Sequence, residues 1–189
     1  DEEWHQKWVQ ERFNWYLRYG INRERLRVRP HESDELSHYA KATSDVEYFF
    51  PWGWGELEGI ANRTDFDLRR HSESSGEHLT YFDEASQQHF TPYVIEPSGG
   101  VDRAALTFLM DAYNEEEVPT AQGKTETRVV LRLHPALAPV KVAVLPLSRN
   151  EALGPLTKKI YDSLLAYGRW PVEYDDTQSI GRRYRRFDE

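Results

Sequence analysis

The sequence predicts a mixed α/β (α+β) fold in two parts, 1–124 and 125–189. Three observations support this. Apolar residues recur at helical spacing near the start, a glycine-rich strand-to-helix turn lies near residue 99, and strand and helix patterns alternate after residue 140. An alternating strand and helix order is typical of a parallel sheet with right-handed crossovers. A charged stretch with few apolar residues, 115–124, would link the two parts.

Composition narrows the class of protein. The chain has 189 residues, of which 39% are hydrophobic and 30% charged, as expected for a soluble globular protein with a core. No apolar run is long enough for a membrane span, and the absence of cysteine excludes disulfides, thiolate catalysis and Cys-ligated zinc. These features fit a cytosolic protein. The net charge of −8 argues against indiscriminate nucleic-acid binding, so an RNA contact would need a local basic patch.

The first part should begin with an amphipathic helix over 2–18, with its tryptophans in the core and Gly20 as a stop. The polar stretch 69–88 predicts a solvated hairpin or insertion. Its histidines, with His89, match no ligand spacing, so no structural metal is expected. Three short elements should lie between the helix and residue 51: a strand over 25–29, a loop over 30–37 and a β-prone segment over 47–50.

Glycines at 53, 55 and 59 interrupt the predicted strand 52–61. Glycine weakens a strand unless something must approach the backbone closely, so this strand could floor a ligand pocket. Glu56 and Glu58 lie two residues apart, which predicts that they share one face. They could hold a magnesium ion or an ammonium group, form a solvated edge, or pair with a nearby arginine.

The segment 91–103 predicts a strand that stops at Pro97, a turn through two glycines, and a helix over 101–113. Such a turn makes an anion site, because free N–H groups and the positive helix end favour phosphate. Arg103, in the first turn, would add a planar charged group. An ordinary helix entry with Ser98 as N-cap accounts for the same residues.

Two segments, Pro51 to Leu68 and Tyr93 to Arg103, together closely resemble the two C-terminal active-site segments of the dimeric glycyl-tRNA synthetases. The second contains the Gly-x-Asp-Arg form of class II motif 3. The resemblance implies that 1–124 is the C-terminal part of a class II antiparallel-sheet catalytic core and that 125–189 begins an α/β anticodon-binding domain. Motifs 1 and 2 would precede Asp1, so the chain is expected to be a fragment that is inactive by itself.

For the whole protein, the resemblance implies a cytoplasmic homodimeric glycine–tRNA ligase. Such enzymes activate glycine with ATP to glycyl-adenylate and pass it to tRNA(Gly), with Mg²⁺ accompanying the ATP. Catalysis of this type depends on placing the glycine carboxylate in line with the α-phosphate and on stabilising the charge that develops there.

The resemblance also implies roles for particular residues. Arg103 would be catalytic, and Glu96 and Ser98 would hold the glycine ammonium while Arg63 takes its carboxylate. Glu58 departs from many family members and receives no role. The implied ATP site comprises Glu56, Leu57, Gly100, Val101, Asp102 and Arg103. The implied glycine site comprises Arg63, Glu96, Pro97, Ser98, Gly99 and Gly100.

Other functions remain open at this stage. The chain could be a non-catalytic, synthetase-like binding or accessory module, or a folded fragment that only binds tRNA. The presence of the ligand-binding side chains implied by the resemblance favours origin from an active synthetase. The arginines at 182–186 could contact tRNA phosphates, or they could form a solvated helix face.

Overall fold

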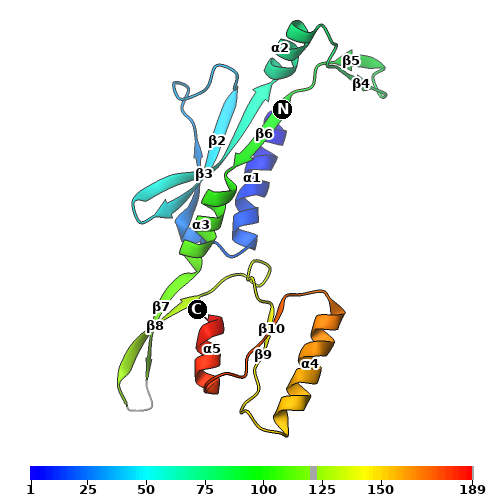
Figure 1. The fold of residues 1–189 in the computed structure, drawn as a ribbon. Coiled ribbons are helices and arrows are strands. Elements are labelled where there is room, and N and C mark those ends of the chain that lie inside the picture. Colours follow the sequence, from blue (N-terminus) through cyan, green and yellow to red (C-terminus); the bar gives the residue numbers. More distant parts are fainter. Residues whose placement is uncertain (120–122, 189) are drawn as a thin grey trace. The chain divides into compact units, whose positions relative to one another are not determined.

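The computed structural model describes residues 1–119 and 123–188 of the chain (Figure 1). The chain forms two compact units, Asp1–Phe108 and Leu109–Glu189. Within the described residues, no helix has both the length and the apolar character needed to cross a membrane.

The first unit is built on a four-stranded antiparallel sheet in the order β1-β2-β3-β6. This confirms the antiparallel sheet that the resemblance implied. A short 3-10 turn, η1 (Arg23–Arg25), leads into the first strand. The strands are β1 (Leu26–Pro30), β2 (Ala42–Phe50), β3 (Gly53–Thr64) and β6 (Val94–Gly99).

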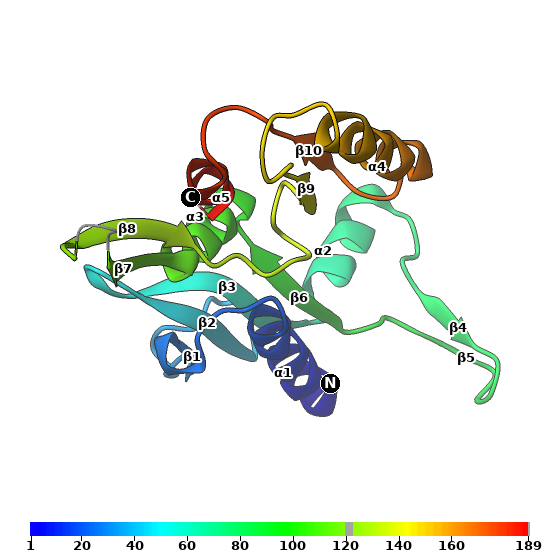
Figure 2. The same cartoon turned by 90° about the horizontal axis from the view of Figure 1, so that it is seen from below.

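Helix α1 (Glu2–Arg18) packs on one face of this sheet, as both views show (Figures 1 and 2). It contributes buried Phe13 and Tyr16 to the core, and Tyr16 stacks on Phe108 of α3 (Val101–Ala112). The expectation that the tryptophans of α1 lie in the core is wrong for Trp4 and Trp8, which are exposed. They lie on the outer side of an amphipathic helix whose inner side is filled by smaller aromatic rings.

The segment between β3 and β6 holds more regular structure than its polar composition indicated. Helix α2 (Phe66–Ser75) was not predicted, and it ends at Gly76, which adopts the left-handed conformation with φ of 77°. That is a usual helix C-cap for glycine. The expected hairpin follows, formed by β4 (Tyr81–Asp83) and β5 (Gln88–Phe90).

Strand β3 carries two bulges, and the first overturns a prediction. Val46 pairs with Glu58 and Glu47 pairs with Glu56, so Leu57 is an extra residue on β3. Directly paired residues share a face, and the extra residue therefore turns Glu56 and Glu58 to opposite faces. The prediction that the two carboxylates share a face is wrong for this reason.

The turn into α3 also differs from its prediction. Strand β6 continues through Pro97 to Gly99, because an edge strand tolerates a residue that lacks an N–H. Ser98 therefore lies in the strand and is not the N-cap. The helix begins at Val101, and the carbonyl of Gly100 accepts the first helical hydrogen bond, from the N–H of Ala104.

The second unit begins with a hairpin in place of the expected linker. Residues Tyr113–Pro119 form β7, which pairs antiparallel with β8 (Thr125–Leu131), while 120–122 lie outside the described residues. Cross-strand charge pairs explain why a run of glutamates is extended: the Glu116 carboxylate accepts from Arg128 at 3.0 Å and also meets Arg132. Glutamate on its own has little preference for strands.

The remainder of this unit follows the predicted order. Strand β9 (Val142–Val144), shorter than the apolar run 140–147, pairs in parallel with β10 (Val172–Tyr174). Helix α4 (Leu153–Tyr167) lies between them in sequence, and α5 (Ile180–Asp188) follows. The assignment of the two units to a catalytic and an anticodon-binding domain stays a prediction.

Candidate active site

The two faces of the four-stranded sheet carry different chemistry. One face, which we call the helix face, packs against α1 and bears Val46, Tyr48 and Ile60, all almost fully buried. The other, which we call the carboxylate face, bears acidic side chains from three strands. The register places these acids on one side: Glu47 pairs with Glu56, Asp45 pairs with Gly59, and Glu96 pairs with Ala61.

The side chains implied in glycine binding come together on the carboxylate face. Arg63 Nη1 donates to Glu96 Oε2 at 2.8 Å, and its Nε donates to Asp67 Oδ2 at 2.6 Å. The centre of the Tyr39 ring lies 4.0 Å from Arg63 Cζ, and this cation–π contact helps to orient the guanidinium. Ser98, two residues after Glu96 on the same strand, faces the same side and is exposed.

Backbone geometry at the end of β3 contributes to the placement of Arg63. Asn62 pairs with Ile95 and Thr64 pairs with Val94, so Arg63 is the extra residue of a second bulge. Thr64 has φ of 53°, an uncommon conformation for a β-branched residue. Bulges near functional sites often re-aim a side chain. Here the bulge lies where the guanidinium turns toward both Glu96 and Asp67.

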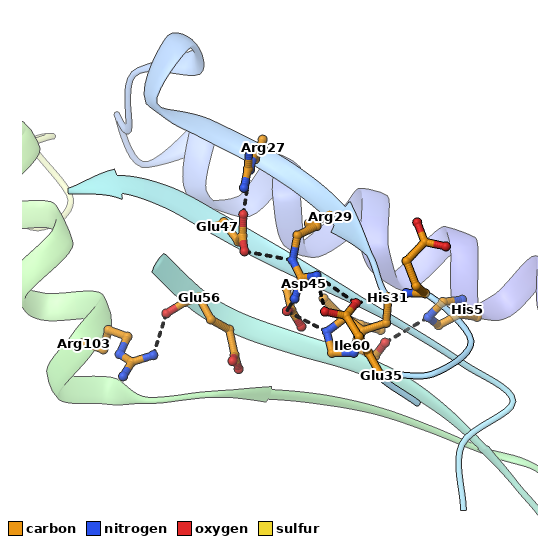
Figure 3. Close-up of polar contacts among 11 residues, drawn as sticks. His5, Arg27, Arg29, His31, Glu35, Asp45, Glu47, Glu56, Ile60 and Arg103 are labelled. Atoms are coloured by element: carbon orange, nitrogen blue, oxygen red, sulfur yellow. Dashed lines mark hydrogen bonds and ion pairs between the residues drawn. The ribbon is translucent and has the colours of Figure 1, made fainter. Parts of the chain in front are cut away.

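The side chains implied in ATP binding meet at the start of α3. Arg103 Nη1 donates to the backbone carbonyl of Glu56 at 2.7 Å, so the guanidinium is held beside β3 (Figure 3). The Glu56 carboxylate is exposed on the carboxylate face, and Gly100, Val101 and Asp102 are exposed at the helix entry. The free N–H groups of that first turn favour an anion.

Three residues implied in ligand binding are oriented away from this face. Leu57 is buried in the core, and Pro97 and Gly99 pair with Ile60 and Glu58 of the helix face. These three can therefore meet a ligand only through their backbone atoms. The pattern arises because strand residues alternate between faces, while the implied site was given as continuous runs of sequence.

Sequence reasoning missed an acidic row on β2. Asp45 and Glu47 are both buried on the carboxylate face, where Arg27 Nε donates to Glu47 at 2.6 Å and His31 Nε2 lies 2.7 Å from Asp45 (Figure 3). Arg29 joins the two carboxylates, donating to Glu47 at 3.1 Å and to Asp45 at 3.3 Å. A signal existed in the sequence: two acids at alternate positions, Asp45 and Glu47, flank Val46 and precede the apolar end of the strand.

Glu58, which had no expected role, forms a buried network on the helix face. Its carboxylate accepts from Arg12 Nε at 2.6 Å and Nη2 at 3.1 Å, and from the Tyr16 hydroxyl at 3.1 Å. Hydrogen bonding to this carboxylate raises the pKa of Arg12. Burial, with the nearby Glu58 charge, raises the pKa of Tyr16, so both donors keep their protons. The network ties α1 to β3 directly beneath Gly99.

Two carboxylates of the carboxylate face lie close enough together to be candidate ligands for a divalent cation such as Mg²⁺. Asp45 Oδ1 and Glu56 Oε1 flank the position above Gly59, at 3.5 and 3.6 Å from where a β-carbon there would lie. Mg²⁺ is usually held by one or two carboxylates together with substrate phosphates and water. Across the described ranges, no group of three or more His, Asp or Glu side chains is arranged as a metal site.

Three of the four arginines of α5 in the second unit, Arg183, Arg185 and Arg186, contact other parts of the protein through their side chains. Arg183 is buried and donates to backbone carbonyls, including that of Thr177 at 2.8 Å. Arg185 pairs with Glu126, and Arg186 Nε donates to Asp175 at 2.9 Å. Of the two uses left open for this cluster, the arrangement does not favour an open phosphate-binding patch.

Comparison with known proteins identifies relatives of the chain. No family model matches the chain. Its whole length aligns with glycine–tRNA ligases from Thermobifida fusca (58% identical), Caldanaerobacter subterraneus (57%) and Streptomyces coelicolor (54%). The chain spans 41%, 39% and 41% of these relatives, or about two fifths of their length. Over its whole length, the chain is therefore a homologue of part of the glycine–tRNA ligases.

Proposed function

We propose that this chain is part of a glycine–tRNA ligase and carries half of its active site on the carboxylate face. The observation that supports this best is the shared location of two groups of side chains. Arg63, Glu96 and Ser98 form one group, and Glu56 and Arg103 form the other. The proposed substrates are glycine, ATP and tRNA(Gly), and the proposed setting is a cytoplasmic homodimer.

In the glycine subsite, Arg63 would bind the substrate carboxylate and Glu96 the ammonium. The pair already holds opposite charges 2.8 Å apart, so a zwitterionic amino acid can exchange salt-bridge partners with both groups. Hydrogen bonds to the Arg63 guanidinium lower the pKa of Asp67, which keeps that carboxylate charged and the arginine fixed. A fixed arginine orients the carboxylate for attack.

In the nucleotide subsite, Arg103 would bind ATP and help to balance the charge that grows on its phosphates. Arg103 Nη1 donates to the Glu56 carbonyl. The rest of the planar guanidinium would stack on the base or donate to a phosphate. Glu56 would hold Mg²⁺, which neutralises phosphate charge when bound. The N–H groups at the start of α3 add to the positive potential.

The reaction joins the glycine carboxylate to the α-phosphate and releases pyrophosphate. A small amino acid is selected because a compact site can exclude any β-carbon by steric contact, while the nearby carboxylates supply affinity for the ammonium. The acceptor ribose of tRNA would then take the glycyl group from the adenylate. No covalent bond to the protein is required.

The test uses the full-length protein that contains this chain, with its intact mass measured first. We expect glycine-dependent ATP–pyrophosphate exchange, and we expect Arg103→Ala to abolish most of it. Arg70→Ala is the matched control, because Arg70 is an exposed arginine of the same unit that pairs only with Glu73 among the contacts described. Absence of exchange in the unmodified full-length protein would reject the proposal and favour a non-catalytic binding module.

A further inference from the structure

We infer that Gly59 is a positioning residue, whose missing side chain leaves room for the two substrates to meet. This inference rests on the proposed function and assigns a role that the resemblance did not. It starts from the place of Gly59 in the sheet. Gly59 lies on the carboxylate face between the two groups of predicted ligand-binding side chains.

Three strands contribute neighbours to this position. Ser98 of β6 is the direct cross-strand partner of Gly59 on one side, and Asp45 of β2 is its partner on the other. Glu56 lies along β3 itself, with its Oε1 3.6 Å from the ideal β-carbon position. A group placed above Gly59 therefore has the proposed glycine subsite on one side and the proposed nucleotide subsite on another.

The protein itself does not require glycine here. The backbone of Gly59 is not in the left-handed region, unlike that of Gly53 or Gly76. A β-carbon would lie 3.5 Å from Asp45 Oδ1 and 3.6 Å from Glu56 Oε1, which is ordinary van der Waals contact. Glycine in a strand that has room for a side chain often marks a place where a ligand approaches the backbone closely.

Gly55, four residues earlier, shows the contrast. A β-carbon at Gly55 would lie 3.0 Å from a ring carbon of Phe50, so the packing of the protein explains that glycine. Among the described residues, no contact this close explains Gly59. Residue 59 instead lacks a side chain at the place where the carboxylate of the substrate and the α-phosphate of ATP would have to approach each other.

The expected effect of a methyl group at this position follows from that geometry. Each substrate alone can bind slightly displaced from the methyl group, but the attack requires both to be in contact above the strand. A displacement of about 1 Å at a reacting centre can cost up to about 100-fold in rate. The rate of adenylate formation should therefore fall more than the affinity for either substrate.

The experiment compares Gly59→Ala with Gly154→Ala in the full-length protein. Gly154 has no atom within 4 Å of an added β-carbon and lies in the second unit, so its alanine variant makes the same chemical change away from the site. The measurements are kcat and glycine KM in ATP–pyrophosphate exchange, the Kd for ATP by calorimetry, and the melting temperature.

For Gly59→Ala we expect kcat to fall about 10-fold or more, with the glycine KM and the ATP Kd changed by less than about threefold. The melting temperature should equal or exceed that of the unmodified protein, because glycine is a poor strand residue. Gly154→Ala should leave kcat, the glycine KM and the ATP Kd unchanged. Its melting temperature should equal or exceed that of the unmodified protein, because Gly154 lies in helix α4 and alanine is favoured over glycine in a helix.

Each other outcome rejects the inference. An unchanged kcat would show that no reacting group lies above Gly59. A kcat loss matched by weaker ATP binding alone, or by a raised glycine KM alone, would place Gly59 within one subsite. A lowered melting temperature would show that the protein itself needs the space. If the unmodified protein shows no glycine-dependent exchange, the proposed function fails, and that result is separate from these.

Discussion

The two faces of the four-stranded sheet use buried charge in different ways. On the helix face, Glu58 is almost fully buried and its three hydrogen bonds come from two side chains of α1. On the carboxylate face, Arg63 and Glu96 pair with each other but remain partly exposed. The first arrangement is closed to a ligand and the second can exchange its partner for one. For Glu58 and Glu96, burial together with the source of the donors therefore distinguishes a structural carboxylate from a proposed functional one.

The largest expected effect on stability is at Glu58. Replacement by alanine leaves Arg12 without the carboxylate that neutralises it in a largely buried position. Breaking a buried pair in this way costs about 3–5 kcal/mol, and the partial exposure of Arg12 favours the lower value. Urea unfolding of Glu58→Ala and of Glu96→Ala, the matched acid on the other face, measures the contrast. Equal losses in the two variants would contradict it.

The next largest effect is expected for Arg103→Ala, and it concerns the activation free energy of the reaction, not the stability of the protein. Removing one group that stabilises developing charge typically costs about 100-fold in kcat, or about 2.7 kcal/mol. Arg103 makes one described hydrogen bond, to a backbone carbonyl at an exposed position, so the free energy of unfolding should change by less than about 0.5 kcal/mol. Paired kinetic and urea measurements on the full-length protein check both values. A large loss of stability would make Arg103 structural.

Two of the glycines of β3, Gly55 and Gly59, give the next test. Gly55→Ala should destabilise the protein by about 1–3 kcal/mol, because the added methyl group would lie only 3.0 Å from a ring carbon of the buried Phe50, which would have to shift on the helix face. Gly59→Ala, on the carboxylate face, should be neutral or stabilising by up to about 1 kcal/mol. Thermal unfolding of both variants measures the difference. If the order of stability is reversed, the assignment of the two positions to opposite faces is wrong.

The smallest effect is a pH dependence at Asp67. Its pKa is lowered from its ordinary value of 3.8, chiefly by hydrogen bonds from Arg63. A lowered folded-state pKa stabilises the protein above pH 4 and loses that contribution as the pH falls through the folded pKa. Asp67→Asn should therefore flatten the loss of stability below pH 4, by less than about 1 kcal/mol for so exposed a pair. An unchanged acid unfolding curve would show that this pair adds no stability.

The regular elements of both units were largely predictable from the sequence, because spacing of apolar residues determines which faces can be buried. Helix α1 follows from that spacing, and the parallel pairing of β9 with β10 follows from the alternating order of strand and helix patterns. The resemblance supplied the identity of the candidate site residues, and the structure shows which of them share a face. Composition alone could not have selected Arg63 or Glu96, since arginine and glutamate occur throughout the chain.

The features that escaped prediction depend on contacts between distant residues. The bulge at Leu57 leaves no mark in the sequence, since two glutamates two residues apart look the same with or without it. The hairpin strand at Glu116 depends on arginines more than ten residues later. Ser98 satisfies the usual preference for an N-cap, but the strand pairing of β6 extends through it. In each case tertiary pairing outweighs local preference.

The most direct test of the whole account compares two arginines that each pair with a glutamate, one on each face. Arg63→Ala and Arg12→Ala are made in the full-length protein, and the glycine KM and the free energy of unfolding are measured for both. We expect Arg63→Ala to raise the glycine KM by about 10-fold or more with about 1 kcal/mol or less of lost stability. Arg12→Ala should lose about 3 kcal/mol of stability with a smaller effect on KM. An unchanged glycine KM in Arg63→Ala would contradict the assignment of the carboxylate face as the substrate face.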